Sequence, residues 1–455
     1  MNDSNRLRAI PEVASLESSA DRIRLAPEVD VPISARVRRL IDTPQFRRLA
    51  RIPQLGLVSL VYPAATHSRF EHSLGVYRLA LLFLRHLASD ARFAARVGPR
   101  DAELFIAAAL LHDIGHWPFC HPIEDMRIRG VPRHEEFIAR FVTAGEIADC
   151  LRSDWGLEPE ELVSVLSEEP KSEARRIIAS LLSGPIDIDK LDYLSRDSLH
   201  AGVPYGRNFD QARLIGSLCL NEAGDGLAIS EKGKTAAEMM VFARYVMFSE
   251  VYWHHGVRSA TAMLQRAFWS LRRTPDIETH FACGEPEFIE WLRERLAETP
   301  AAELFAGLFG ARRRLHKRLA QFSFIENRAV YERLAGRPYA WLCRCAEELA
   351  TLLGGACGRE IAPWRVLLDA PPVEKEVEFR IEVFYAKEGR YRLLEDVSPV
   401  VRALAKEQFD DFVKRVRVFV DPEIADDTRR VADLGALITR AAALADREPE
   451  RGSDG

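Results

Sequence analysis

Apolar residues recur at helical spacing through most of the chain, up to about residue 360. Arg69–Leu87 is the strongest case, because its apolar side chains return every three or four residues and line one helix face. Asp101–Gly115, with the sequence DAELFIAAALLHDIG, is apolar enough to be buried and stops at Gly115. The pattern therefore predicts a mainly α fold.

Further helices are expected around this pair, and residues 236–271 are predicted to form one long helix. The shorter predicted helices are 35–40, 44–52, 132–143, 159–166 and 173–182.

Strand signals are few and come late in the chain. Residues 377–385 alternate polar and apolar side chains, as a half-buried strand does. Segments 391–393 and 416–420 are further strand candidates, with a helix expected over 399–413. A hairpin over 220–230 is predicted to turn at Asp225-Gly226.

These patterns predict four parts along the chain. They are a flexible N-terminus over 1–20, a helical body over 21–360, a small α+β appendage over 361–446 and a flexible tail over 447–455.

Composition excludes several classes of protein. With 47% hydrophobic and 29% charged residues, the chain is ordinary for a globular protein. Lys+Arg number 63 against 68 Asp+Glu, and the net charge of -5 disfavours a globally basic nucleic-acid binder. The sequence has no run of about 18 apolar residues, so no membrane span is predicted. The polar N-terminus lacks an apolar signal core.

Cysteine usage predicts a reducing compartment. The seven cysteines are sparse and form no CxxC pair, so neither a disulfide framework nor a structural zinc site is expected. The cytoplasm is the expected location.

Histidines and acidic residues concentrate in short blocks. Four of the twelve histidines fall between residues 112 and 134, and an acidic run follows over 187–197. Asp113 ends the helix that is expected to be buried, and a buried carboxylate is costly unless it is paired or binds a metal. A site of His72, His112, Asp113 and Asp189 would have mixed imidazole and carboxylate ligands. That set suits Mn, Fe, Ni, Co, Zn or Mg, with water completing the coordination.

Each of these residues also has a simpler interpretation. A His-Asp dipeptide occurs by chance, His72 alone fits a core histidine, and the 187–197 run alone fits a solvated helix face. Their joint order is far more specific than any one of them.

The order His72, His112-Asp113, Asp189 resembles the H…HD…D signature of the HD phosphohydrolase superfamily. Three blocks, HSRFEHSLGV from His67, HDIGHWPFCH from His112 and DIDKLDYLSRD from Asp187, resemble its dNTP triphosphohydrolase branch. The resemblance covers about residues 40–260. It implies an HD-domain helical bundle and a divalent metal cofactor held by those four ligands.

The same resemblance implies roles for further residues. Arg69 would meet a substrate phosphate, Lys190 would neutralise another, and Tyr193 would form a hydrogen bond nearby. Gln54 and Asp197 would approach the sugar and its 3′-hydroxyl. Catalytic roles in the triphosphate pocket would fall to His116, His121 and His134, with Glu124 orienting His121 where the family often has Asp.

The implied activity is metal-dependent hydrolysis of a dNTP to deoxynucleoside and inorganic triphosphate. Two alternatives stay open. One is another substrate, such as a nucleoside monophosphate or a cyclic nucleotide. The other is a nucleotide-sensing or nucleic-acid-binding protein, motivated by the basic run 312–318. The resemblance also implies a homo-oligomer, dimer or tetramer, with an allosteric nucleotide site.

Overall fold

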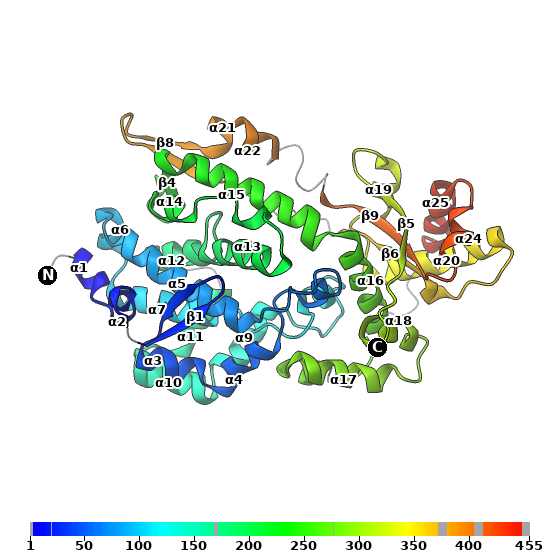
Figure 1. Ribbon diagram of the computed structural model, residues 1–455, viewed down its shortest axis with the longest axis horizontal. Helices are drawn as coiled ribbons and strands as arrows, with labels where there is room; N and C mark the ends of the chain where they lie inside the picture. The colour runs from blue at the N-terminus through cyan, green and yellow to red at the C-terminus, as the bar shows by residue number, and fades with distance from the viewer. Residues whose placement is uncertain are drawn as a thin grey trace.

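The computed structural model describes residues 3–19, 21–167, 172–275, 277–371, 380–404 and 413–447. Helices make up most of this part of the chain, and they surround one large core and one smaller core. The predicted mainly α fold is confirmed (Figure 1). No helix within the described ranges is long and apolar enough to cross a membrane.

Three helices form the centre of the body. Helix α5 (Arg69–Leu87) packs against α7 (Pro99–Leu111) and α13 (Ile188–Ala201). Local signals set their ends. Ser68 caps α5 by accepting a hydrogen bond from the backbone N–H of Glu71. The Asp187 side chain caps α13 by accepting one from the backbone N–H of Lys190. The strongest helix prediction, Arg69–Leu87, is thus confirmed at both ends.

Shorter helices surround this centre, and those expected near 35–52, 132–143 and 159–182 are present. They are α3 (Ala35–Ile41), α4 (Pro44–Arg47), α9 (His134–Val142), α10 (Gly145–Trp155), α11 (Pro159–Ser167) and α12 (Glu173–Ser183). Further helices are α6 (Ala91–Arg96), α8 (Cys120–Glu124), α14 (Gln211–Ile215), α17 (Glu285–Leu296), α18 (Ala302–Phe309), α19 (Arg328–Leu334), α21 (Leu394–Val397) and α24 (Ala425–Arg429).

The prediction of one long helix over 236–271 is wrong. Helix α15 (Lys234–Met247) runs into a π-helical turn, Phe248–Tyr252, and α16 (His255–Trp269) starts anew after it. The turn presents the Tyr252 hydroxyl to the buried Asp197 on α13. A tertiary contact therefore overrides the local helical preference.

The first residues of the chain are packed rather than loose within the described range 3–19. Helices α1 (Asp3–Arg8) and α2 (Pro11–Ala14) bury Leu7, Ile10 and Val13 in the large core. Their spacing of three residues puts these side chains on one face. The tail from residue 448 lies outside the described residues.

A small antiparallel sheet separates the two cores. Its strand order is β5 (Lys317–Phe322), β9 (Val416–Val420) and β6 (Val366–Asp369). Along β9, Val416, Val418 and Val420 enter the small core, whereas Phe419 enters the large one. Because successive side chains of a strand point to opposite faces, both faces of β9 are buried. Helices α20 (Tyr339–Cys357) and α25 (Leu434–Ala445) complete the small core.

A second sheet belongs to the body and has the order β3 (Leu218–Leu220), β4 (Leu227–Ser230), β7 (Glu382–Tyr385) and β8 (Arg390–Leu393). The hairpin expected over 220–230 is present as the antiparallel β3–β4 pair. Its loop is closed by Asn221, whose Oδ1 accepts hydrogen bonds from the amides of residues 224, 225 and 226. A third pair, β1 (Arg22–Leu25) with β2 (Val29–Pro32), lies on the body.

The two cores do not divide the chain at residue 360. Strand β7 pairs in parallel with β4 of the body, so residues 380–404, including α22 (Pro399–Ala403), return to the large core. The small core draws on residues 322–353 as well as on later ones. Of the predicted strand 377–385, residues 377–379 lie outside the described residues, as do 405–412 of the predicted helix 399–413.

Candidate active site

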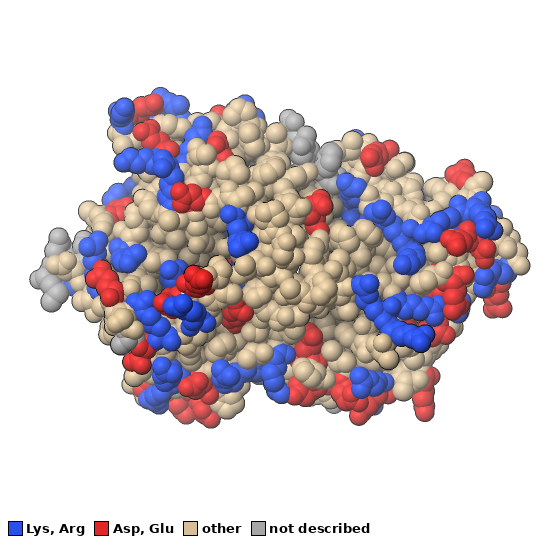
Figure 2. Space-filling model, in the orientation of Figure 1, with Lys and Arg blue, Asp and Glu red and all other residues tan. Residues whose placement is uncertain are grey.

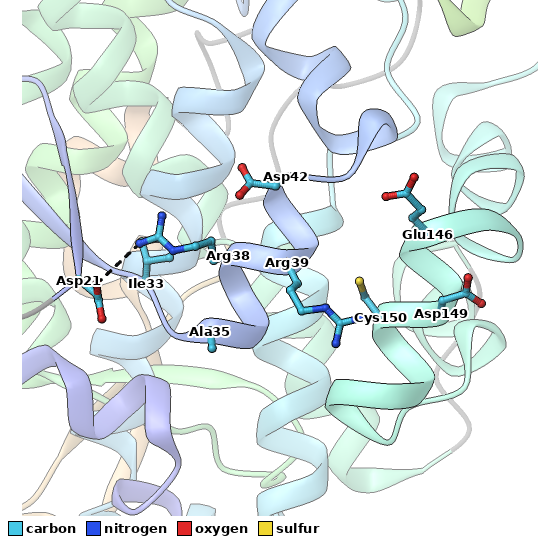
Figure 3. Close-up of a pocket in the computed structure, with 9 residues that line it drawn as sticks. All are labelled: Asp21, Ile33, Ala35, Arg38, Arg39, Asp42, Glu146, Asp149 and Cys150. Carbon is cyan, nitrogen blue, oxygen red and sulfur yellow. Dashed lines mark ion pairs between the residues drawn. The ribbon is translucent and has the colours of Figure 1, made fainter.

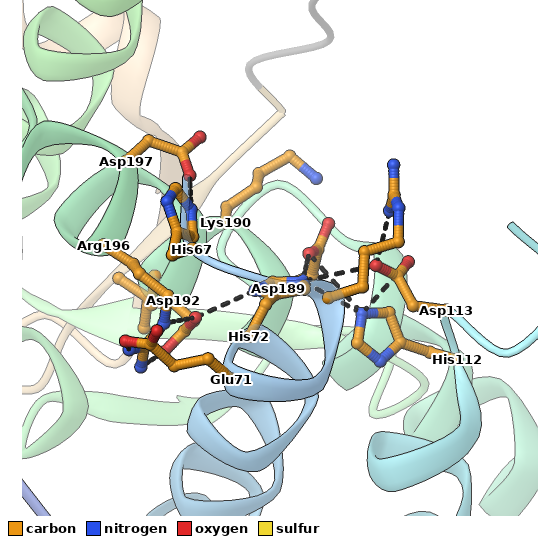
Figure 4. A network of polar contacts seen from close by, with 12 residues as sticks. His67, Glu71, His72, His112, Asp113, Asp189, Lys190, Asp192, Arg196 and Asp197 are labelled. Carbon is orange, nitrogen blue, oxygen red and sulfur yellow. Dashed lines mark hydrogen bonds and ion pairs between the residues drawn. The ribbon is translucent and has the colours of Figure 1, made fainter. Parts of the chain in front are cut away.

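The four predicted metal ligands meet where α5, α7 and α13 come together (Figure 4). His72 Nε2 lies 3.2 Å from His112 Nε2 and 3.1 Å from Asp189 Oδ1. His112 Nε2 lies 3.8 Å from Asp189 Oδ1 and 3.5 Å from Asp113 Oδ1. Asp113 Oδ2 is 3.9 Å from His72 Nε2. His72, His112 and Asp189 thus share one centre, and Asp113 lies beside it, with Oδ1 near His112 and Oδ2 near His72.

These distances fit a divalent cation. Donor atoms about 2.0–2.2 Å from an ion, at right angles around it, stand about 3 Å apart. The observed separations of 3.1–3.9 Å are close to that value. With two imidazoles and two carboxylates, and without a thiolate, the set suits Mn, Mg, Fe, Co, Ni or Zn.

A layer of buried side chains orients His72. Its Nδ1 lies 2.8 Å from Asp192 Oδ2, and Arg196 donates two hydrogen bonds of 2.8 Å to the same carboxylate. Gly75 is required for this approach, since a Cβ there would collide with Asp192 and Arg196. Burial alone would lower the pKa of His72, but its hydrogen bonds to Asp189 and Asp192 raise that pKa to about 10.

Two cations stand beside the ligands. The Arg69 guanidinium is buried and donates a 2.6 Å hydrogen bond to Asp113 Oδ2. Burial opposes ionisation of Asp113, but the charged Arg69 guanidinium beside it holds its pKa well below the ordinary value. Lys190 Nζ pairs with the buried Asp187 at 2.5 Å. The predicted phosphate-binding residues are therefore at the site, and each is paired with a carboxylate.

The three predicted catalytic histidines cluster next to Asp113. The His116 ring centroid lies 4.0 Å from that of His134 and 5.1 Å from that of His121. Gly115 permits this packing, because a Cβ there would collide with the His134 backbone oxygen. Glu124 Oε1 lies 3.0 Å from His134 Nδ1, and Glu124 Oε2 lies 3.6 Å from His121 Nδ1.

Electrostatics favour a charged Glu124 and a neutral His116. Burial opposes ionisation of Glu124, but its hydrogen bonds to His121 and His134 lower its pKa strongly. Burial and the nearby Arg69 hold the pKa of His116 well below its ordinary value. Glu124 thus orients both histidines, whereas only His121 was predicted as its partner.

The predicted sugar-binding residues lie on the other side of His72. Asp197 accepts a 2.6 Å hydrogen bond from the Tyr252 hydroxyl, and its Oδ1 lies 2.9 Å from His67 Nε2. The backbone N–H of Gln54 donates a hydrogen bond to the backbone oxygen of His67. The side-chain Oε1 of Gln54 is buried and has no hydrogen-bond partner among the described residues. Figure 4 shows His67 and Asp197 on the side of His72 opposite to His112 and Asp113.

Tyr193 is half-buried on α13, and its ring centroid lies 6.4 Å from that of Tyr252. Burial raises the pKa of its hydroxyl, which stays protonated at neutral pH. Its predicted hydrogen-bonding role stays a prediction.

Sequence reasoning assigned no role to five further residues of this network. These are His67, Glu71, Asp192, Arg196 and Tyr252. Asp192 could have been predicted from the sequence, because it lies about one helical turn after Asp189 and so shares its helix face. Tyr252 could not, because its position depends on the π-helical turn.

Two surface cavities lie away from these residues. One, of about 680 Å³, lies between α3 and α10 and is lined by side chains of both charges, including Arg38, Arg39 and Asp149 (Figure 3). The other, of about 750 Å³, is lined by Arg85 and His86 at the end of α5. Neither lining includes a metal ligand.

The fold and the site define a metal-dependent phosphohydrolase of the HD type. Residues 69–197 match the HD domain family, and residues 209–439 match the HD associated region. The chain belongs to the HD-domain phosphohydrolase superfamily, as the sequence signature predicts.

Its relatives include proteins with and without a stated activity. Uncharacterized protein MJ1154 of Methanocaldococcus jannaschii is 30% identical over 84% of this chain and 75% of its own length. Deoxynucleoside triphosphate triphosphohydrolase SAMHD1 of Gallus gallus is 30% identical over 58% of this chain. The match covers 48% of that protein, so the chain spans about half of its length.

A solved structure shares most of this architecture. A phosphohydrolase of Bacteroides thetaiotaomicron superposes with a TM-score of 0.66 at 25% identity. The superposition covers 88% of this chain and 100% of that one.

Proposed function

We propose that this protein hydrolyses deoxynucleoside triphosphates to deoxynucleoside and inorganic triphosphate. The observation that carries the proposal is the placement of unlike groups on two sides of the four ligands. Arg69 and three histidines lie on the Asp113 side, whereas His67, Asp197 and Tyr252 lie on the other. A triphosphate needs the first set, and a sugar hydroxyl needs the second. The activity in the name of the relative SAMHD1 supports the same substrate class.

The His72, His112, Asp113 and Asp189 side chains would hold a divalent cation. When bound, it supplies Lewis acidity toward a phosphoryl oxygen and lowers the pKa of water.

Arg69 and Lys190 supply fixed positive charge for the phosphates. Because Arg69 is buried, its charge is screened little and acts strongly on a nearby anion. Its planar guanidinium suits two-point contact with phosphate oxygens. Lys190 stands in the first turn of α13, where amide groups also favour negative charge.

The histidines next to Asp113 would handle protons. Glu124 faces Nδ1 of His134 and of His121, which directs the Nε2 atom of each ring away from the carboxylate. A ring held in this way can donate a proton to the leaving 5′-oxygen or orient the attacking water. A neutral His116 would donate its single N–H to a triphosphate oxygen, without serving as a general acid.

The Asp197 side would select the sugar. Asp197 is buried, as is the Oε1 atom of the half-buried Gln54, and a ligand hydroxyl would satisfy that oxygen. A substrate that lacks this hydroxyl would leave buried groups unpaired and would be rejected.

The direct test is product analysis in ¹⁸O-labelled water. The full chain is incubated with each dNTP and with Mn²⁺, Mg²⁺ or Co²⁺ in turn. We expect unlabelled deoxynucleoside and triphosphate with one ¹⁸O, because attack on the α-phosphorus leaves the new oxygen on the triphosphate. Asp113→Ala is the inactive control. Release of monophosphate or pyrophosphate from every dNTP would refute the proposal.

The alternative substrates are tested in the same assay. Nucleoside monophosphates and cyclic nucleotides carry less charge than a triphosphate, and the Arg69, Lys190 and histidine set favours the triphosphate. Turnover of these smaller substrates without turnover of any dNTP would favour another phosphoester.

The basic run 312–318 gives little support to nucleic-acid binding. Figure 2 shows Lys and Arg gathered over the part of the surface near the small core, interspersed with acidic residues. Arg314 pairs with Asp421 and Glu423, and Arg313 donates to the Leu60 backbone oxygen. Three further expectations stay predictions: the homo-oligomer, the allosteric nucleotide and the cytoplasmic location. Light scattering with and without a dNTP tests the first two.

A further inference from the structure

A second group of metal-ligating side chains lies next to the four-ligand centre. One ligand atom each from His116, Cys120, His121 and His134 lies within 4.8 Å of the others. They come from the turn after α7, from the start of α8 and from the start of α9. Cys120 and His116 are buried, His134 is half-buried and His121 is exposed, so an ion can enter from the His121 side.

A carboxylate orients two of these imidazoles, as carboxylates do in metal sites. Nδ1 of His134 and Nδ1 of His121 both face Glu124, at 3.0 and 3.6 Å. Nδ1 of His116 lies 3.1 Å from Asp113 Oδ1 but forms no hydrogen bond with it, so this orientation applies to His121 and His134. A carboxylate at Nδ1 favours the tautomer with a bare Nε2 and raises its basicity toward a cation.

The donor chemistry differs from that of the first centre. One cysteine and three histidines form a four-coordinate set that is typical of Zn²⁺, and a thiolate disfavours Mg²⁺ and Mn²⁺. The His72 centre has no thiolate. Both neighbouring groups therefore accept Zn²⁺, but only the group with Cys120 disfavours Mg²⁺ and Mn²⁺.

We propose that His116, Cys120, His121 and His134 form a second metal site that binds Zn²⁺, and that zinc at this site inhibits the hydrolase. Binding would engage the three histidines that face the triphosphate, so substrate and zinc exclude each other. The inhibitory half rests on the proposed function, whereas the binding half does not.

Metal binding is tested first, without any activity assay. The metal-free full chain is titrated with Co²⁺ as a spectroscopic probe and with Zn²⁺ for stoichiometry. We expect two equivalents, with a thiolate-to-cobalt charge-transfer band. His72→Ala should lose one equivalent and keep the band. Cys120→Ser should lose the band, whereas the control Cys150→Ser, a buried cysteine on α10, should keep it.

X-ray absorption at the zinc edge needs no variant. Zinc added to the wild-type protein should show a sulfur at about 2.3 Å beside nitrogens at about 2.0 Å, whichever ion the first centre holds. A shell without sulfur would overturn the site, and so would a cobalt band that survives in Cys120→Ser.

Inhibition is tested on the Mn²⁺-loaded protein with a dNTP. Zinc should lower turnover at least about tenfold, and Cys120→Ser should raise the half-inhibitory zinc concentration at least about tenfold. Cys150→Ser should behave as wild type. Zinc binding with unchanged turnover would overturn the inhibitory half. Absence of dNTP turnover without zinc would instead contradict the proposed function and leave the binding results standing.

Discussion

His72 Nδ1 lies 2.8 Å from Asp192 Oδ2, and this contact turns Nε2 of the same ring toward His112 and Asp189. Asp192 is itself held by two hydrogen bonds from Arg196, which also pairs with Glu71. Asp192 is therefore a positioning residue for the metal centre, and a carboxylate in this place is a general means of orienting a histidine ligand.

Asp192→Asn should weaken metal affinity about 10- to 100-fold, because the amide no longer holds the His72 ring by a charged hydrogen bond. Turnover should recover at saturating metal, since the four ligands stay in place. The measurement is metal titration followed by kcat at high metal concentration. Asp149→Asn, on the exposed face of α10, is the control. Unchanged affinity would remove Asp192 from this role.

His72→Ala and Asp113→Ala should each lose bound metal and turnover together, because both remove a ligand from the shared centre. Metal content by mass spectrometry and dNTP turnover are measured on the same samples. His86→Ala is the matched control, since His86 lies on the same helix and contacts the Leu218 backbone oxygen instead. Turnover by metal-free protein would contradict the prediction.

Arg69→Ala should keep its metal and lower kcat/KM about 10- to 100-fold, because a charged hydrogen bond to phosphate contributes about 1.5–3 kcal/mol. Arg69→Lys should recover part of the loss, since it keeps the charge but not the planar fork. Arg47→Ala, an exposed arginine stacked on Phe70, is the control. Loss of metal from Arg69→Ala would instead show that Arg69 mainly stabilises Asp113.

Glu285 should make the protein less stable as pH rises. Burial raises its pKa to about 7, and its Oε2 has no hydrogen-bond partner among the described residues. In the window between about pH 4.5 and about pH 7 the unfolded chain releases this proton and the folded chain keeps it. The folded state therefore loses stability through this window.

The effect of Glu285 is measured by denaturant unfolding of Glu285→Gln and wild type at both ends of the window. The variant should gain roughly 1–3 kcal/mol relative to wild type at the upper end and little at the lower end. The amides at the start of α17 offset part of the cost. Glu294→Gln, exposed on the same helix, should show no such pH dependence. Equal gains in stability at the lower and upper pH would mean that Glu285 is charged in the folded protein throughout the window.

Much of the site was predictable because its residues lie in short blocks with recognisable order. Arg69–Leu87 is a helix for local reasons: the apolar period, and the Ser68 cap. The break at Phe248–Tyr252 was not predicted, because apolar spacing continues through it, and its Tyr252 hydroxyl contacts the remote Asp197.

The sequence by itself determined the helical character of the body and the ends of α5, and it predicted the metal ligands that the structure brings close together. These follow from spacing and residue type, which act over a few neighbouring positions. Only the tertiary structure decided that Asp192 supports His72, that residues 380–404 return to the body and that Cys120 joins three histidines. These relations join residues that are far apart in the chain or on different elements, and packing of the whole core brings them together.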